Sequence, residues 1–223
     1  MRRLVLLLLL TGSLLHAQRT PSVRATGEGV VAAMPDLVRI NLTISTPAGT
    51  AQEAADQNAT ASQAVTNRVK ALIGTTGEIR TVSYSVTPNY RTTPPSQTLI
   101  GFTASNTLEV TAHDLNLAGK IVDAAVQAGA TSVGGLRFGL KDSDPQRRDA
   151  LKRATQVARA DATAIAEGLS VRLGSILAAD EGSSVSIYNP TDARAEIAAT
   201  ATTFEIGLVE VRATVTLEIA ILQ

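Results

Sequence analysis

The first side chains whose types suggest catalysis are a histidine and a carboxylate that adjoin in the sequence, His113 and Asp114. A histidine oriented by a carboxylate is the general base of hydrolytic triads, but those side chains meet in space and are not defined by adjacency. No serine lies in a Gly-x-Ser-x-Gly elbow, which presents the nucleophile in many hydrolases. We interpret His113 as a partly exposed turn residue and Asp114 as a helix cap, and we expect no catalytic residue.

Two further patterns resemble ligand-binding motifs but lack the residues that would complete them. Asp142 and Asp144 begin like a calcium loop, but residues 145–147 are Pro, Gln and Arg, where oxygen ligands and a glycine are needed. We read Asp144 as the cap of a helix that continues with Pro145. Gly134-Gly135 lacks the other glycines and the following helix of a dinucleotide loop, so we assign it to the start of a strand.

Metal and cofactor sites are not predicted either. The chain has no cysteine and only two histidines, of which His16 lies in a removable leader, so the usual zinc spacings are excluded. Glu28 stands between Gly27 and Gly29 in a strand pattern, where glycines indicate a bulge or a close approach of another backbone.

One alternative stays open, because folding can gather residues that are distant in sequence. A cleft that united them with perturbed protonation would favour a hydrolase or a small-ligand-binding envelope protein. The residues in question are Glu28, Asp36, His113 and Asp142.

The first eighteen residues have the three-part pattern of a secretory signal peptide. Two arginines precede a leucine-rich run over residues 4–10, and small Ala17 stands just before Gln18. The run is shorter than the roughly 20 residues of a membrane-spanning helix, and polar residues 11–13 interrupt it. We expect residues 1–17 to be removed, leaving residues 18–223 in the periplasm or secreted, with the outer membrane surface as a further location.

Charge and composition narrow the class of protein. The chain has 20 Lys+Arg and 20 Asp+Glu, and loss of Arg2 and Arg3 with the leader leaves 18 against 20, a net charge of −2. That balance gives no general attraction for nucleic acid. Hydrophobic residues make up 44% but aromatic residues only 3%, so we expect a core of aliphatic side chains. No later segment is apolar enough to span a bilayer, so we expect no transmembrane segment in the mature protein.

Hydrophobic periodicity predicts an α+β fold. A capping-box pair, Thr50 and Glu53, starts a first helix that ends at Gly74, and its apolar stripe includes Asn58, which we expect to be a buried, hydrogen-bonded amide. Residues 88–98 are polar and contain two prolines, so we expect a loop there. The expected strands cover residues 23–33, 38–45, 78–87, 100–112, 136–140, 175–180 and 209–221.

The order of these elements is ββαβ, then βαβ, then αββ. We expect mostly antiparallel sheet with about three helices on one face. The mature chain is interpreted as a single domain, with two intimate halves at about 22–92 and 99–223 as the alternative division. In the last strand, Val215 belongs to the apolar face that we expect to be buried.

The third expected helix carries alanine at every fourth position, at 150, 154, 158, 162 and 166. We expect its core side to include Val157, Ile165 and Leu169. A step of four residues turns about 400° around a helix, so the alanine row winds across the surface. Part of it would then face outward, where another copy of the helix could approach closely, which predicts a homo-oligomer.

The ordered set of short patterns resembles the SIMPL-domain family, once described as a domain of unknown function, in the branch of periplasmic and outer-membrane-associated immunogenic proteins. The resemblance covers nearly the whole mature chain. Ser170 departs from it, because a glycine is expected after the third helix. The matching residues are Thr26–Gly29, Pro35-Asp36, Ala54, Asn58, Thr81, Tyr84, Pro88, Tyr90, Gly101–Asn106, Gly129-Ala130, Leu136–Asp142, the alanines at 150–162, and Gly207–Ile219.

The resemblance implies an envelope protein of a kind that assembles into rings and is linked to stress tolerance. It carries over no catalytic residue and no cofactor. We therefore expect a non-enzymatic protein that acts through self-assembly or through contacts with other envelope proteins. The runner-up is the uncharacterised hydrolase or ligand binder described above.

Overall fold

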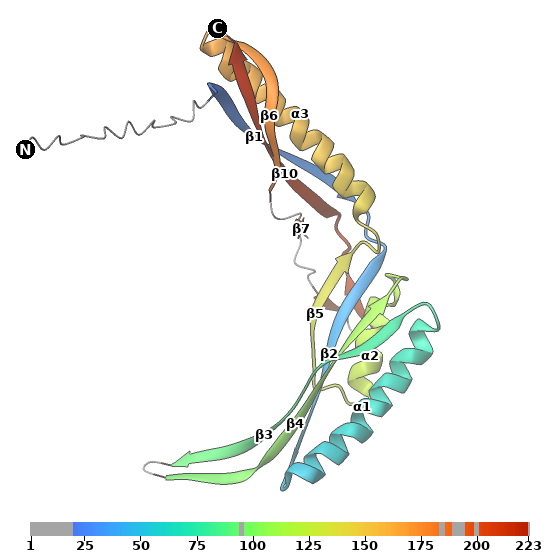
Figure 1. Ribbon diagram of the computed structural model, residues 1–223. Helices are drawn as coiled ribbons and strands as arrows, with labels where there is room; N and C mark the ends of the chain where they lie inside the picture. The colour runs from blue at the N-terminus through green and yellow to red at the C-terminus, as the bar shows by residue number, and fades with distance from the viewer. Residues whose placement is uncertain (1–19, 94–95, 183–185, 189–194, 199–200, 223) are drawn as a thin grey trace, which may run out of the picture.

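The computed structural model describes residues 20–93, 96–182, 186–188, 195–198 and 201–222. The predicted signal peptide and its cleavage site lie outside these residues. Figure 1 shows an elongated, curved molecule with one sheet and α3 at the end that holds both described termini, and a second sheet with α1 and α2 at the other end. The structure is α+β, with three helices and mostly antiparallel strands, as the sequence predicts.

The elements follow one another in an order close to that expected. Three helices are present among the described residues: α1 (Ala51–Ile73), α2 (Leu117–Gln127) and α3 (Asp144–Gly168). The strands are β1 (Ser22–Ala33), β2 (Leu37–Ala48), β3 (Glu78–Thr93), β4 (Ser96–Ala112), β5 (Ser132–Gly139), β6 (Arg172–Glu181), β7 (Ser186–Tyr188), β8 (Ala195–Ala198), β9 (Ala201–Phe204) and β10 (Val209–Leu222).

Two four-stranded sheets form the framework. In the first sheet β10 is central, with β1 on one side and β6 and β7 on the other. The second sheet has the order β3-β4-β2-β5. Only residues 34–36 separate β1 from β2, and Asp36 fixes this corner: its backbone N–H donates to Gly139 O at 3.0 Å, and its Oδ1 accepts from Lys141 N at 2.6 Å. Strands β1 and β2 thus form one nearly continuous stretch of extended chain that runs from the first sheet into the second.

The first sheet is covered by α3 through residues of minimal size. All five alanines of the every-fourth row are buried, three of them against Val23, Ala25 and the apolar face of β10. A Cβ added to Gly29 would lie 2.0 Å from Ala150 O, and one added to Gly27 would lie 2.2 Å from Ala154 O. The expected close backbone approach at these two glycines is therefore present.

The expectation for the faces of α3 was wrong. Val157, Ile165 and Leu169 are exposed, and the alanine row forms the buried side. Successive alanines of the row lie over β1, with Ala150 and Ala154 at Gly29 and Ala154 and Ala158 at Gly27. The glycines of this strand leave room for nothing larger than alanine. Replacing Ala158 or Ala162 with arginine would disrupt this packing rather than an intermolecular contact.

The second sheet and α1 enclose the larger aliphatic core. Its centre contains Ile40, Leu42, Ile44, Val65, Val69 and Val110, with Ile121 contributed by α2.

The capping box of α1 is formed as predicted, with Glu53 N donating to Thr50 Oγ1 and Thr50 N donating to Glu53 Oε2. The separate β8–β9 pair rests on α2, where Thr202 Oγ1 donates to Asp123 Oδ1 at 2.7 Å. Strand β10 matches its pattern, with Val215 buried.

Two local predictions were wrong at the ends of elements. In the expected loop at residues 88–98, residues 88–93 and 96–98 are strand, because β3 and β4 remain paired as far as Thr93 and Ser96. Pro88 is tolerated because β3 is an edge strand, which needs hydrogen bonds on one side only. Asp144 is the first residue of α3 and not its cap, and its N–H bonds to Asp142 Oδ1 at 2.9 Å.

Ser170 stands where the family pattern has glycine. Its backbone is left-handed, a conformation that glycine adopts easily. Its φ is 58°, and among the described residues it is the one non-glycine with positive φ. The chain still leaves α3 at this point, so the departure changes the local energy and not the fold.

The contact between α3 and β1 predicts that Gly29→Ala destabilises the protein. The new Cβ would overlap backbone oxygen, which no rotamer change relieves, so we expect a loss of about 3 kcal/mol in the free energy of unfolding. Denaturant titration followed by circular dichroism measures it. Gly168→Ala is the matched control, because nothing lies within 4 Å of the added Cβ and alanine favours a helix. Equal stability of both variants would show that α3 does not lie this close to β1.

Candidate interaction surface

Of the four residues considered for a cleft, Asp36 and His113 lie beside Lys141, the neighbour of Asp142 in the chain, whereas Glu28 lies apart from them. Glu28 lies in the first sheet, where its Oε1 accepts from Arg212 Nη1 at 3.1 Å. His113 lies at the end of β4 in the second sheet, on the rim of a shallow pocket with Lys141. The carboxylates of Asp36 and Asp142 each accept a nearby backbone N–H, from Lys141 and Asp144. These contacts assign structural roles to the acids.

Arg212 is the one described group whose protonation is clearly shifted. The hydrogen bond to Glu210, followed by the one to Glu28, raises the pKa of Arg212 above its ordinary value. An arginine is charged at physiological pH in any case, so this shift provides no acid or base for catalysis. His113 lies next to Asp114, whose Oδ1 accepts instead from Asn116 N.

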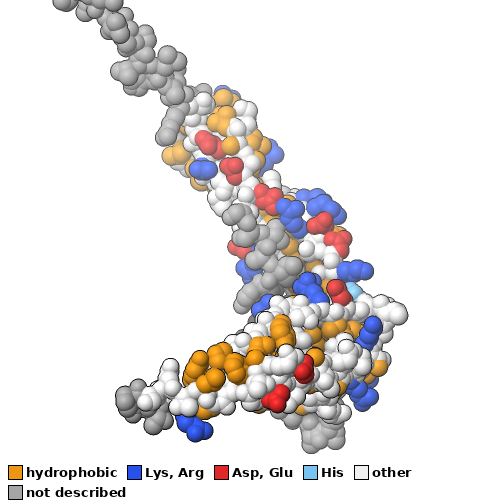
Figure 2. Space-filling model, turned by 60° about the horizontal axis from the view of Figure 1, so that its bottom comes forward, with side chains coloured by type: hydrophobic (Ala, Val, Ile, Leu, Met, Phe, Trp, Pro, Cys, Tyr) orange, Lys and Arg blue, Asp and Glu red, His pale blue; other side chains and the backbone are white. Residues whose placement is uncertain are grey.

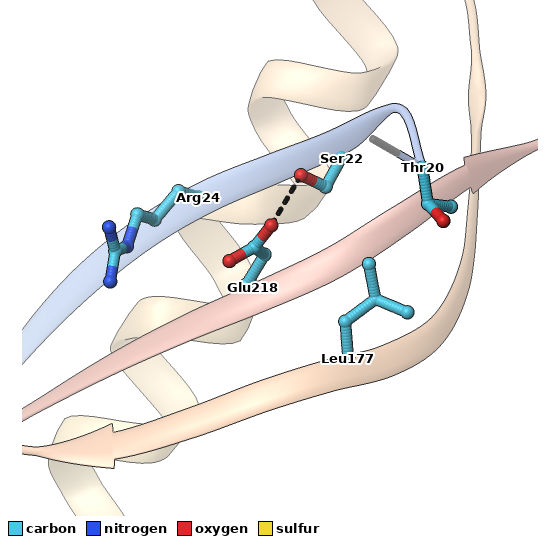
Figure 3. Close-up of a pocket in the computed structure, with 5 residues that line it drawn as sticks. All are labelled: Thr20, Ser22, Arg24, Leu177 and Glu218. Atoms are coloured by element: carbon cyan, nitrogen blue, oxygen red, sulfur yellow. Dashed lines mark hydrogen bonds between the residues drawn. The ribbon is translucent and has the colours of Figure 1, made fainter. Parts of the chain in front are cut away.

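A pocket on the first sheet is polar and open. It is lined by Thr20, Ser22, Arg24, Leu177 and Glu218, as Figure 3 shows. Ser22 Oγ donates to Glu218 Oε1 at 2.7 Å, and Arg24 pairs with Asp180 at 3.8 Å. The hydroxyl and the carboxylate are bonded to each other with no histidine among the lining residues, so this pocket does not resemble a nucleophile activated by a base.

Side chains that could bind a metal ion and helices that could span a membrane are the remaining features of the described part of the chain. It contains no group of three or more His, Asp or Glu side chains that could hold a metal ion. Nor does it contain a helix long and apolar enough to cross a membrane.

The most distinctive surface is the outer part of the β3–β4 hairpin, which we call the arm (residues 82–93 and 96–104). In Figure 1 the arm projects beyond the other strands at the end of the molecule opposite α3. Tyr84 and Tyr90 are 53% and 54% exposed, and Val82, Leu99 and Ile100 are exposed as well. Figure 2 shows a band of hydrophobic side chains running towards this end.

The arm has one apolar face and one hydroxyl-rich face. The strand register places Tyr84 opposite Asn106 and Val86 opposite Ala104 on the side that α1 covers further along the sheet. The other face carries short polar side chains, such as Thr87 opposite Thr103, and Thr103 Oγ1 accepts from Asn89 Nδ2 at 2.7 Å. The arm therefore extends the inner face of the sheet beyond the helix that would bury it.

Charge and aromatic content set the arm apart from the rest of the surface. Arg91 is the single charged residue between positions 81 and 108. The protein has three Tyr and three Phe, and half of these six, Tyr84, Tyr90 and Phe102, lie on the arm. Aromatic enrichment with few charges is the composition of the centre of a protein–protein interface.

A buried amide anchors the arm to the body. Asn58 of α1 is fully buried, and its Nδ2 donates to Ile44 O at 2.8 Å and to Ala104 O at 3.1 Å, which lie on neighbouring strands β2 and β4. Its Oδ1 accepts from Ser62 Oγ, which in turn accepts from Asn106 Nδ2. Asn58 is buried and hydrogen-bonded as predicted, and it clamps the sheet at the base of the arm.

Sequence reasoning missed the arm as a candidate surface. The alternation of Val82, Tyr84 and Val86 predicts a strand, but it does not tell whether a helix covers its apolar side. The absence of charge from residue 81 to 108, apart from Arg91, was the available signal.

Comparisons with known proteins give one family and two relatives. The family model described as SIMPL, protein of unknown function (DUF541), matches residues 23–219. The 26 kDa periplasmic immunogenic proteins of Brucella melitensis biotype 1 and of Brucella abortus strain S19 are each 29% identical over 164 residues. The aligned stretch covers 71% of this chain and 66% of each relative, just under two thirds of their length.

The anchor predicts a specific loss of stability. Asn58→Ala leaves two buried carbonyl groups without their amide donor, so we expect the free energy of unfolding to fall by about 2–3 kcal/mol. Amide hydrogen exchange should also accelerate around Ala104. Asn67→Ala on the exposed side of the same helix is the control, with an expected change within about 0.5 kcal/mol. Similar losses in the two variants would remove the anchoring role from Asn58.

Proposed function

We propose that this chain, which belongs to the SIMPL family, is a non-enzymatic periplasmic protein that self-assembles, with the arm as its principal contact. The observation that carries the proposal is the exposed, almost uncharged apolar face of the arm. Isolated apolar side chains are ordinary on protein surfaces, but a contiguous patch rich in tyrosine is typical of a binding surface.

The periplasm is the location that we propose. Two observations support it: the relatives are named as periplasmic proteins, and the N-terminus has the pattern of a signal peptide. A peripheral position on the outer membrane and a role in tolerance of envelope stress are further parts of the proposal, and the family resemblance alone supports them.

The proposal of a non-enzymatic role rests on the hydrogen bonds that the candidate carboxylates form. The carboxylates considered for catalysis are engaged by neighbouring backbone N–H groups or by Arg212. The exposed apolar surface of the arm contains none of these carboxylates. A contact protein accounts for both features more simply than a hydrolase does.

We further propose that the partner is a second copy of the chain. A second apolar strip, Val157, Ile165 and Leu169, is exposed along one flank of α3, and Figure 1 places α3 at the end of the molecule opposite the arm. Contact between two different surfaces of identical chains is heterologous, and it generates rings or filaments. The corner bonds of Asp36 support treating the chain as one folding unit in such an assembly.

Charges placed on the arm should disrupt this assembly. In Tyr84→Arg/Tyr90→Arg, burial of the arm against another copy would desolvate two cations, so we expect a smaller species than the wild type in size-exclusion chromatography with light scattering. Far-ultraviolet circular dichroism should stay unchanged, because both residues lie on an exposed edge strand.

The matched control adds the same charge away from the arm, at two other exposed hydrophobic residues. Met34→Arg/Val126→Arg should retain the wild-type mass. The proposal fails if the mature wild-type protein is a monomer throughout the micromolar range, or if the arm variant assembles as the wild type does.

A further inference from the structure

Two arginines stand directly opposite each other on the outer face of the second sheet. The register of β2 and β5 pairs Arg39 with Arg137. Directly opposed residues of an antiparallel pair have Cβ atoms about 5 Å apart, and like charges in this position destabilise the sheet. Neither guanidinium forms an ion pair with any residue in the described ranges. An unfavourable pair of this kind indicates that a counter-charge comes from outside the chain.

A β-bulge brings the two arginines together. Asn41 pairs with Gly134 and Arg39 with Arg137, so two steps along β2 correspond to three along β5. Without the extra residue, Leu136 would lie opposite Arg39. The left-handed φ of 59° at Gly135 accommodates the bulge. The bulge thereby turns Arg137 to the outer face, where Arg39 lies.

Space above Gly139 lets a third cation join them. The Nη1 atom of Arg39 lies 3.9 Å from the position that a Cβ of Gly139 would occupy, so its guanidinium extends over this glycine. Gly139 lies between Arg137 and Lys141 along the chain. Arg39 and Lys141 also line one shallow pocket of about 280 Å³, together with His113.

Acidic residues near the pocket leave a surplus of positive charge. Glu109 is paired with Arg80 at 2.7 Å. Asp36 accepts the backbone N–H of Lys141, and Glu78 lines the pocket from the start of β3. The residues that line the pocket include three cations and two carboxylates: Arg39, Arg80 and Lys141, and Glu78 and Glu109. Arg137, opposite Arg39, adds a fourth cation, and the nearby carboxylates of Asp36 and Asp142 each accept a backbone N–H. A singly charged anion gains little from this surplus, whereas a compact dianion can contact two guanidinium groups at once.

We propose that Arg39, Arg137 and Lys141 form a binding site for a doubly charged oxyanion, a phosphate group of a soluble compound or of a lipid headgroup. Guanidinium groups bind phosphate through two parallel N–H···O bonds, and lysine adds a point charge. The site is separate from the arm, and it does not depend on self-assembly.

Binding is tested first with inorganic phosphate and pyrophosphate on the mature protein. At constant ionic strength, set with sodium chloride, each should raise the melting temperature in a saturable way, and calorimetry should give a dissociation constant. Arg39→Gln/Arg137→Gln should weaken binding roughly tenfold or more. Its melting temperature without phosphate should equal or exceed that of the wild type, because the repulsion is removed; a purely structural role of the arginines would lower it.

The control and the vesicle experiment separate the remaining outcomes. Arg148→Gln on the exposed part of α3 should bind phosphate as the wild type does. Sedimentation with phosphatidylcholine vesicles, with and without phosphatidic acid, distinguishes the sources. Binding that requires phosphatidic acid and the two arginines supports a headgroup, and phosphate binding without vesicle binding supports a soluble ligand. The proposal is overturned if phosphate acts no differently from chloride, or if the double variant binds it as the wild type does.

Discussion

The close approach of α3 to β1 is the contact on which the rest of the first sheet depends. Gly27 and Gly29 leave no room for a side chain between strand and helix, and the helix meets them with alanine. Small residues bury little area each, so the stability of this layer comes from the number of contacts and from density of packing. Neither the strand nor the helix has room for a larger residue at this contact. We therefore expect few substitutions to be tolerated there.

Because the interior is aliphatic and rich in alanine, few of the protein's aromatic residues are buried in it. Both cores are built almost without aromatic residues, and the buried part of the second one contains Phe138 alone of that class. Tyr84 and Tyr90 lie instead on the arm, outside the cover that α1 provides. Asn58 of α1 bonds to the neighbouring strands β2 and β4 at the base of the arm. The body thus presents a projection rich in tyrosine and poor in charge, whose composition suits contact with another protein surface.

Sequence patterns predicted those parts of the fold in which one local signal determines the outcome. The alternation of β10, the capping box of Thr50 and Glu53, and the buried amide of Asn58 are such cases. The buried side of α3 could not be predicted in this way, because two faces competed, and the glycines that decided between them lie more than 120 residues earlier. The pairing of residues 88–93 was missed because proline usually ends a strand, and an edge position removes that restriction.

The central claim is that another copy of the chain covers the arm. Hydroxyl-radical footprinting read by mass spectrometry measures the solvent access of Tyr84 and Tyr90 directly, with buried Phe138 as an internal reference. As protein concentration rises through the micromolar range, oxidation of both tyrosines should fall while that of Phe138 stays low. Oxidation of Tyr84 and Tyr90 that stays high and constant at every concentration would contradict the account, because the arm would then remain in water.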